Sequence, residues 1–187
     1  MGLQYMKCYR IITDHSDERQ LQSDLSSLNS RSSDHFMNFN IKKCKHLAIT
    51  KGKNILQTSY NLNGWRITDV TTEKDLGVHI SSTLSWNDHI DLIIRGANKM
   101  LGLIYRRCTN ECDQLTLLTL YKSLVGPQLE YASQVCSPYT EGKIMAIERV
   151  QRRATKVILK CHFSITYPER LVKLGLLPLE FRSPWKF

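Results

Sequence analysis

The sequence predicts an α+β protein, in which a small antiparallel sheet with one N-terminal helix precedes a mainly α-helical bundle. Two observations lead to this class. Residues 45–81 hold short runs of strand-forming residues separated by turn signals. From Trp86 onward, apolar residues recur at helical spacing. We therefore expect two sections, a β-containing one over residues 1–85 and a helical one over residues 86–187.

The N-terminal helix is expected over residues 17–33. Ser16 is the candidate N-cap, and Asp17 and Glu18 suit the positive end of the helix dipole. An apolar stripe then follows at intervals of four and three residues, formed by Leu21, Leu25 and Leu28. This narrow stripe is the expected apolar face of the helix.

The β section begins with a strand expected from about Lys45 to Thr50. Two strand-like runs then flank the dipeptide Asn63–Gly64, which favours a tight hairpin turn. A third strand is expected from about Leu76 to Ser81. Together these runs predict one small antiparallel sheet over residues 45–81.

The helical section opens with the clearest amphipathic pattern in the chain. Its apolar positions, which predict a core-facing stripe, are Ile90, Ile93, Ile94, Ala97, Met100, Leu101 and Ile104. A second helix is expected from about Asp113, with inward-facing Leu117, Leu120, Tyr121 and Leu124. Pro127 should end or bend it near Val125, before a short helix around residues 129–135.

A further helix is expected over residues 141–160, and its two faces differ in chemistry. At 100° per residue, one arc is apolar and holds Ile144, Ile147, Val150, Ala154, Val157 and Ile158. The opposite arc is basic and holds Arg149, Arg152, Arg153, Lys156 and Lys160. A last short helix begins near Tyr167 and should end before Gly175.

The composition favours an anionic partner. The 187 residues include 26 Lys and Arg against 17 Asp and Glu, which gives a formal charge of +9. The excess lies toward the C-terminus, because residues 1–28 carry a net charge of −1 and residues 141–173 carry +5. No apolar run reaches the length of about 18–20 residues that a membrane span needs. The first residues, MGLQYMKCYR, have no apolar core and no cleavage pattern, so we expect no secretory signal. We therefore expect an intracellular protein, cytoplasmic or nuclear, with no membrane partner.

The six cysteines predict no metal centre. Cys108 and Cys112 are close in sequence, but no second pair completes a four-ligand zinc pattern. Cys161–His162 is the one combination that would supply the missing ligands. The alternative interpretation is a set of reduced intracellular thiols.

Six stretches of the chain resemble a known family, in order and in spacing. They are LQSDLSSL, FNIKKCK, EKDLGVHISSTLSWNDHI, LYKSLVGPQLEYASQV, IERVQRRATK and YPERLVKLGLLPLE. They are similar to the end of the palm, the thumb and the following region of non-LTR (LINE-type, Jockey-like and chicken-repeat-like) retrotransposon reverse transcriptases. The resemblance extends from about Lys7 to Phe187 and implies RNA-directed DNA polymerase ancestry and a thumb-like helical section.

The resemblance also implies that this chain has no catalytic residues. The family carries a pair of aspartates just before KCYR, where this chain has Gly2-Leu3-Gln4-Tyr5-Met6. The intact family uses two magnesium ions held by carboxylates. Asp14, Asp17 and Glu18 are the nearest acids, and we interpret them as helix-start residues. We expect no cofactor, no metal site and no small-molecule substrate.

Some family-like positions remain at the edge of the missing site. Lys43 matches a lysine thought to protonate pyrophosphate, and Leu76, Gly77 and Val78 match the hairpin that grips the primer end. The alternative interpretation is a surface lysine and an ordinary strand. The chain departs from the family at three positions, with Arg31 and Cys136 where Trp is usual and Gly126 where Arg is usual.

Three functional hypotheses follow. The first is a truncated reverse transcriptase fragment that is catalytically inactive alone. The second is a non-catalytic, basic nucleic-acid-binding helical protein, whose 141–160 helix contacts the phosphates of an RNA or DNA duplex. The alternative interpretation of that basic face is a solvated side of a bundle helix. The third hypothesis, an unrelated helical interaction domain, is disfavoured by the six ordered stretches.

Overall fold

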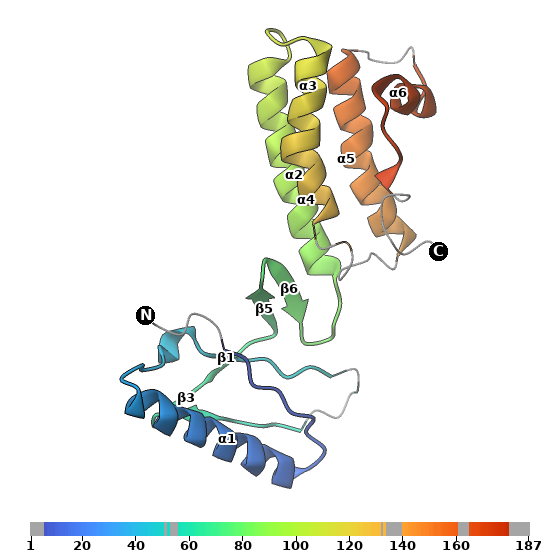
Figure 1. Cartoon of the computed structure of the whole chain (residues 1–187). Coiled ribbons are helices and arrows are strands. Elements are labelled where there is room, and N and C mark those ends of the chain that lie inside the picture. Colours follow the sequence, from blue (N-terminus) through green and yellow to red (C-terminus); the bar gives the residue numbers. More distant parts are fainter. Residues whose placement is uncertain are drawn as a thin grey trace. The chain divides into compact units, whose positions relative to one another are not determined.

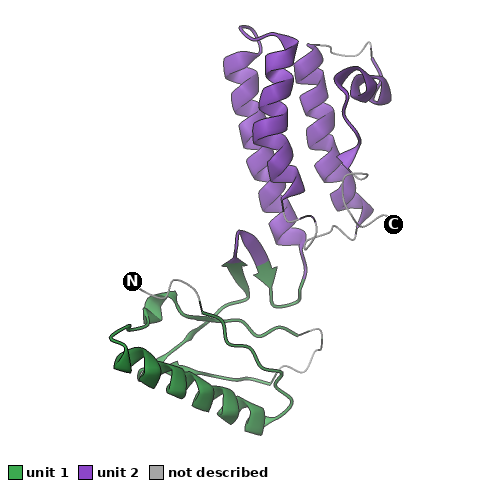
Figure 2. Cartoon of the chain, in the orientation of Figure 1, with its two compact units in different colours: residues 1–74, 80–84 green, residues 75–79, 85–187 purple. Residues whose placement is uncertain are grey.

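A computed structural model describes residues 6–50, 52, 56–131, 133, 140–160 and 165–179. The chain is α+β, as the sequence predicts, with an N-terminal helix, short strands and then several helices (Figure 1). It divides into two compact units (Figure 2). Unit 1 comprises residues 1–74 and 80–84, and unit 2 comprises residues 75–79 and 85–187.

Helix α1 spans His15–Asp34 and begins two residues before the predicted start. Its N-cap is Asp14, whose side chain accepts hydrogen bonds from the amides of Ser16 and Asp17, and Asp17 completes a capping box. The prediction of Ser16 as the N-cap is therefore wrong. A carboxylate at residue 14 satisfies amides that a cap at residue 16 would leave without a partner.

The hairpin predicted at Asn63–Gly64 is confirmed. Strand β2 (Asn61–Leu62) pairs antiparallel with β3 (Trp65–Arg66). Both turn residues have positive φ, 52° at Asn63 and 78° at Gly64. This is the backbone of a two-residue turn that matches the twist of its strands, and Asn-Gly is the dipeptide that adopts it most readily.

The single antiparallel sheet predicted over residues 45–81 is not formed. The strands make three separate two-stranded sheets, and β1 (Lys45–His46) pairs in parallel with β4 (Thr68–Asp69). The first strand is two residues long instead of the expected six. The alternation of apolar and polar residues predicts which residues form strands, but it does not predict which strands pair. The pairing of β1 with β4 also depends on how the intervening β2–β3 hairpin is placed.

The third predicted strand is also shorter than expected. Strand β5 (Thr72–Asp75) pairs with β6 (Val78–Ser81), and Leu76 and Gly77 form the connection. Both connecting residues have positive φ, 45° and 84°. A backbone in this region cannot continue a strand, so β6 begins at Val78.

Unit 1 has a small core. Tyr60, Leu62 and Ile67 are buried, and the half-buried residues around them are Leu21, Leu25, Phe39, Ile41 and Cys44. The side chain of Gln22 ties α1 to β2, because it accepts a hydrogen bond from the Asn61 amide at 2.8 Å and donates one to the Asn61 carbonyl at 2.9 Å. Leu21 and Leu25 of the predicted α1 stripe therefore pack against the core of the hairpin.

In unit 2, α2 spans Asn87–Cys108 and confirms the predicted amphipathic stripe. Ile90, Ala97, Leu101 and Ile104 are buried, and Ile93, Ile94 and Met100 pack at the edge of the core. Leu117, Tyr121, Val125 and Leu129 from the next helices close the same core. Among the described residues, fourteen buried side chains make up this cluster, against three in the core of unit 1.

Pro127 does not end its helix. Helix α3 (Gln114–Leu120) continues through a π-helical turn, η2 (Tyr121–Val125), into α4 (Gly126–Glu130). The wider turn removes the clash that a proline ring makes with the carbonyl four residues earlier. Along this continuous helix the buried residues are 117, 121, 125 and 129, at intervals of four. Leu124 falls outside this series and is 40% exposed, so the prediction that it faces inward is wrong. Of the helix expected around 129–135, residues 129 and 130 end α4 and Tyr131 has an extended backbone; residues 132, 134 and 135 lie outside the described residues.

Helix α5 (Glu141–Leu159) packs against α2, and α6 (Tyr167–Leu174) ends at Gly175 as predicted. A fully buried amide, that of Gln151, fixes α5. It accepts a hydrogen bond from the Tyr121 hydroxyl at 2.6 Å and donates to the Tyr167 hydroxyl at 3.1 Å and to the Leu177 carbonyl at 2.9 Å. The inner face of α5 therefore contains a polar centre in addition to the predicted apolar arc.

The Tyr167 hydroxyl donates to Glu148, and this carboxylate also accepts the Leu179 amide at 2.9 Å. Burial and the neighbouring Glu148 raise the pKa of Tyr167, so the phenol stays protonated. The segment after α6, which includes Leu177 and Leu179, is thus hydrogen-bonded to the inner side of α5. Among the described residues, no helix is both long and apolar enough to cross a membrane.

The unequal cores predict unequal stability. We expect limited proteolysis of the full chain to remove unit 1 first and to leave a fragment that starts near residue 75 and contains α2 to α6, because the larger core opens less readily. Mass spectrometry of the digestion products checks this. In Leu117→Ala, unit 2 should be digested as readily as unit 1, because the loss of a fully buried side chain lowers its stability by about 3 kcal/mol. Equal protection of residues 6–50 would contradict the prediction.

Candidate nucleic-acid interface

The five predicted cations of α5 share one exposed face. The side chains of Arg149, Arg152, Arg153, Lys156 and Lys160 are all exposed, while Val150, Ala154 and Ile158 on the opposite side are buried. Lys160 follows the last helical residue and is the C-cap, with a left-handed backbone. The predicted separation of basic and apolar arcs is therefore present.

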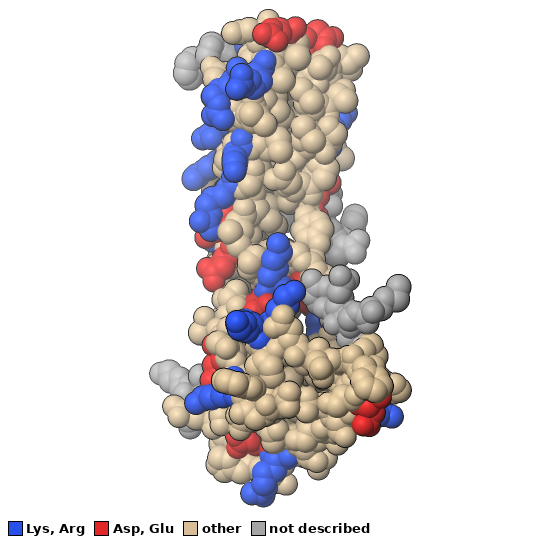
Figure 3. Space-filling view, turned by 90° about the vertical axis from the view of Figure 1, so that its left-hand side faces the viewer, with Lys and Arg blue, Asp and Glu red and all other residues tan. Residues whose placement is uncertain are grey.

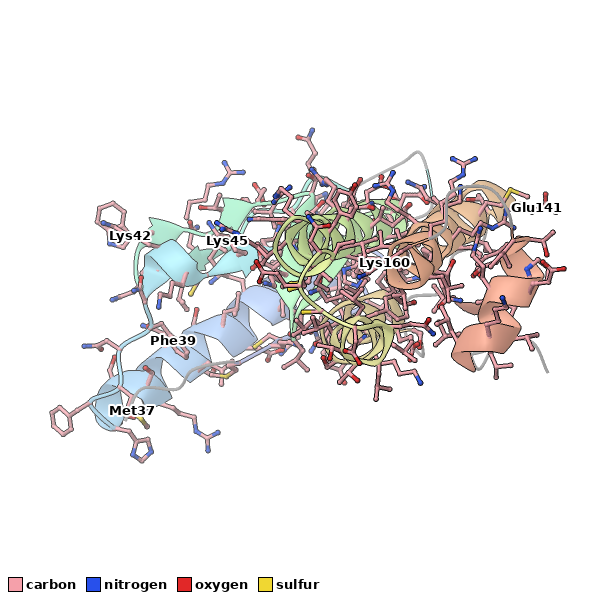
Figure 4. All side chains as sticks on the ribbon, turned by 90° about the horizontal axis from the view of Figure 1, so that it is seen from above. Met37, Phe39, Lys42, Lys45, Glu141 and Lys160 are labelled. Atoms are coloured by element: carbon pink, nitrogen blue, oxygen red, sulfur yellow. The ribbon has the colours of Figure 1, made fainter. Side chains whose placement is uncertain are left out.

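Neighbouring elements hold three of these side chains. The Arg152 guanidinium lies 4.7 Å from the centre of the Tyr167 ring. The Arg153 guanidinium donates to the Asn98 side chain of α2 at 3.1 Å, and the Lys160 ammonium donates to the Cys112 carbonyl at 3.2 Å (Lys160 is labelled in Figure 4). All three contacts are to neutral groups, so the positive charges are positioned without being neutralised.

The α5 helix is not the only basic element of unit 2. On α2, Arg95, Lys99 and Arg106 are exposed and lie opposite the core stripe. Their spacing of four and then seven residues places them on one face of the helix. These three cations were not predicted from the sequence, in which the apolar stripe of α2 is the more prominent pattern. The same helical plot would have revealed them.

Part of each helix carries an excess of positive charge in its sequence. Residues 92–107 of α2 hold four cations and residues 149–160 hold five, and neither stretch holds an acid. Figure 3 shows Lys and Arg side chains in a column along the helical unit. Near the start of both helices, Asp91 binds the Lys143 ammonium at 2.5 Å. A long surface of one sign raises the local concentration of polyanions and their rate of association.

The family-like hairpin residues, Leu76, Gly77 and Val78, form the tip of the β5–β6 hairpin. This tip, residues 75–79, belongs to unit 2, and the rest of the hairpin belongs to unit 1. The Tyr131 hydroxyl donates to the Leu76 carbonyl at 2.6 Å. Gly77 lies directly beneath this tyrosine, since an added Cβ would be 2.7 Å from its hydroxyl oxygen. Val78 is buried and the Leu76 side chain is exposed. Tyr131 therefore already hydrogen-bonds the Leu76 carbonyl and fills the space where a side chain at residue 77 would lie.

A histidine pair supports the same tip. The His79 amide donates to His89 Nδ1 at 3.4 Å, and the two rings stack 6.1 Å apart. Burial lowers the pKa of His89, and the neighbouring His79 adds to this shift. Neutral His89 is needed here, because a protonated Nδ1 would no longer accept the His79 amide.

Lys43 lies in unit 1, in the 3₁₀ turn η1 (Ile41–Lys43). Its side chain is exposed, like those of Lys42 and Lys45, which Figure 4 labels. It is therefore a surface lysine in this structure.

The acids near the N-terminus act as helix-start residues, as predicted. Asp17 accepts hydrogen bonds from the Thr13 hydroxyl at 2.6 Å and from the Thr13 amide at 2.9 Å, and Thr13 lowers the pKa of this carboxyl. Glu18 binds His15 and the Ser59 amide, which lower its pKa. These oxygens are already engaged by the protein. Within the described part of the chain, no group of three or more His, Cys, Asp or Glu is arranged to hold a metal ion.

The thiols of Cys108 and Cys112 are free. They lie at the end of α2, and the Cys112 amide donates to the Cys108 carbonyl at 2.8 Å. Burial raises the pKa of Cys112. Cys136, Cys161, His162 and residues 2–5 of the Gly2–Met6 stretch lie outside the described residues.

Comparison of the chain with known protein families, with curated proteins and with solved structures found no match.

The Gly77–Tyr131 contact predicts a local cost for a side chain at residue 77. Gly77→Ala should speed hydrogen exchange at the His79 amide about 5- to 30-fold, because a non-glycine residue at positive φ costs about 1–2 kcal/mol and the methyl group meets Tyr131. NMR exchange rates measure this. When Tyr131 is also replaced by Ala, Gly77→Ala should still be destabilising through the positive φ of residue 77, but no longer through contact of the methyl group with the tyrosine ring. Gly142→Ala, where nothing lies within 4 Å of the added Cβ, is the control. An unchanged rate at His79 would show that the tip is not held by this contact.

Proposed function

We propose that the chain corresponds to the end of the palm, the thumb and the following region of a non-LTR retrotransposon reverse transcriptase, and that it is catalytically inactive alone. The observation that carries this proposal is the set of six family-like stretches in family order. Unit 2 is compatible with it, because it is a helical bundle of the kind that a thumb requires.

The absence of activity follows from the chemistry of nucleotide transfer. Two metal ions must be held by carboxylates so that the primer hydroxyl attacks and pyrophosphate leaves. The position of the family's aspartate pair is occupied by Gly2-Leu3-Gln4-Tyr5-Met6. The nearest acids, Asp14, Asp17 and Glu18, are committed to the start of α1.

Recombinant protein of this sequence should therefore not extend a primer. The assay is oligo(dT) extension on poly(rA) with magnesium or manganese. We expect incorporation equal to that of a buffer control. Since Asp17 and Glu18 are helix-start residues, Asp17→Asn and Glu18→Gln should leave this background unchanged. Incorporation above background that falls in these variants would refute the proposal.

We also propose a second function, non-catalytic binding of nucleic acid by unit 2. The observation that favours it is the exposed cationic face of α5, with five cations over three turns and no acid among them. Like charges at this spacing repel one another, and phosphates relieve the repulsion. Contacts to phosphates fix the position of a ligand without reading its sequence. Binding is therefore expected to be insensitive to sequence and sensitive to salt.

Neutralising the face tests this second function. Replacing Arg149, Arg152, Arg153 and Lys156 with Gln should weaken binding to a mixed-sequence duplex and make the dependence of log K on log salt shallower by up to about 3 to 4, because each lost phosphate contact removes about 0.9 from the slope. Fluorescence anisotropy over a salt series measures both quantities.

A matched control removes the same charge elsewhere. Arg19, Arg31, Lys42 and Lys43 are exposed cations of unit 1, and their replacement with Gln should leave the slope nearly unchanged. Equal effects in the two variants would mean that net charge alone governs binding. Unchanged affinity in the α5 variant would remove this face from the proposal.

A further inference from the structure

We propose that the α2–α5 seam of unit 2 binds single-stranded nucleic acid, with the exposed ring of Tyr105 stacking on an unpaired base. This inference rests on the proposed nucleic-acid binding and names its preferred ligand. It depends on the packing of α2 against α5, which places Tyr105 of α2 beside the basic face of α5.

Helices α2 and α5 run side by side in the same direction. Three contacts follow one another along the pair: Asp91 with Lys143 near the start, Asn98 with Arg153 in the middle, and the Cys112 carbonyl, just past the end of α2, with Lys160. In Figure 1 the two ribbons run in the same direction along the bundle, with α3 and α4 drawn between them in that view. The exposed cations of both helices therefore belong to one surface.

Tyr105 lies on the side of α2 that faces this seam. It follows Asn98 by seven residues, almost two full turns, and therefore shares its face of the helix. Tyr105 lies between two contacts with α5. The Asn98–Arg153 contact comes before it in the sequence, and the contact of Lys160 with the Cys112 carbonyl comes after it. The Tyr105 side chain is nevertheless 56% exposed. Arg106 is its neighbour in the chain, and Lys156 precedes Lys160 by one turn of α5.

An exposed aromatic ring among cations is the combination that single-strand binders use. The cations follow the phosphates, and the ring stacks on a base. The bases of a duplex already stack on one another, so the ring gains nothing from a fully paired ligand. The other aromatic ring near the basic face, that of Tyr167, is covered by the guanidinium groups of Arg152 and Arg170 at 4.7 and 5.5 Å. Tyr105 is therefore the ring that an unpaired base can reach on the described part of this surface.

The test compares a single strand with a duplex of equal length. Fluorescence anisotropy of the full chain is measured with a labelled oligo(dT) and with a mixed-sequence duplex at one salt concentration. Tyr105→Ala should lower the affinity for oligo(dT) about 5- to 30-fold, in line with the loss of one stacked base. Its effect on the duplex should be below about twofold. Tyr105→Phe keeps the stacking face and should bind oligo(dT) like the original protein.

A control and a second signal make the result decisive. Trp65 is an exposed aromatic residue of unit 1, and Trp65→Ala should leave both affinities unchanged. Stacking should also quench the tyrosine fluorescence that Tyr105→Phe removes. Equal losses on both ligands, or no loss in Tyr105→Ala, would overturn the inference while leaving phosphate binding intact. Failure of the original protein to bind either ligand would instead overturn the proposed nucleic-acid binding itself.

Discussion

The arrangement of unit 2 depends on the buried amide of Gln151. A fully buried amide is tolerated only when its donors and acceptor are satisfied, and here Tyr121, Tyr167 and the Leu177 carbonyl supply the partners. These partners come from η2, α6 and the segment after α6. Rotation of α5 about its axis would break all three hydrogen bonds at once. The amide therefore fixes which side of α5 faces the core.

The basic surface is a consequence of that fixed rotation. With Gln151 inward, Arg149, Arg153 and Lys156 point outward, and Arg153 reaches Asn98 of α2. The exposed cations then lie on two neighbouring helices that are joined by the Arg153–Asn98 contact, and neither stretch 92–107 nor stretch 149–160 of the sequence holds an acid. Like charges at this spacing repel one another, while the hydrogen bonds of Gln151 hold the opposite, inner side of the same helix. A stable scaffold beneath a repulsive surface is what a polyanion-binding site requires.

The sequence predicted those features that are set by neighbouring residues. The α2 stripe, the two arcs of α5 and the Asn63–Gly64 turn follow from helical periodicity and from the backbone preferences of Asn and Gly. The parallel pairing of β1 with β4 and the π-helical turn before Pro127 did not follow, since each depends on contacts between distant segments. Tyr105 was missed for the same reason, because its place beside α5 appears only when two helices are packed.

Mapping the contact surface in solution tests the central claim, that unit 2 binds nucleic acid through the α2–α5 surface. Hydrogen exchange and side-chain NMR shifts of the full chain are recorded with and without an unlabelled oligonucleotide at low salt. The account predicts shifts at the guanidinium signals of Arg95, Arg106, Arg149 and Arg153 and slowed exchange along residues 95–106 and 149–160, all reversed as salt is raised. Shifts confined to residues of unit 1, or none at concentrations that saturate binding, would contradict it.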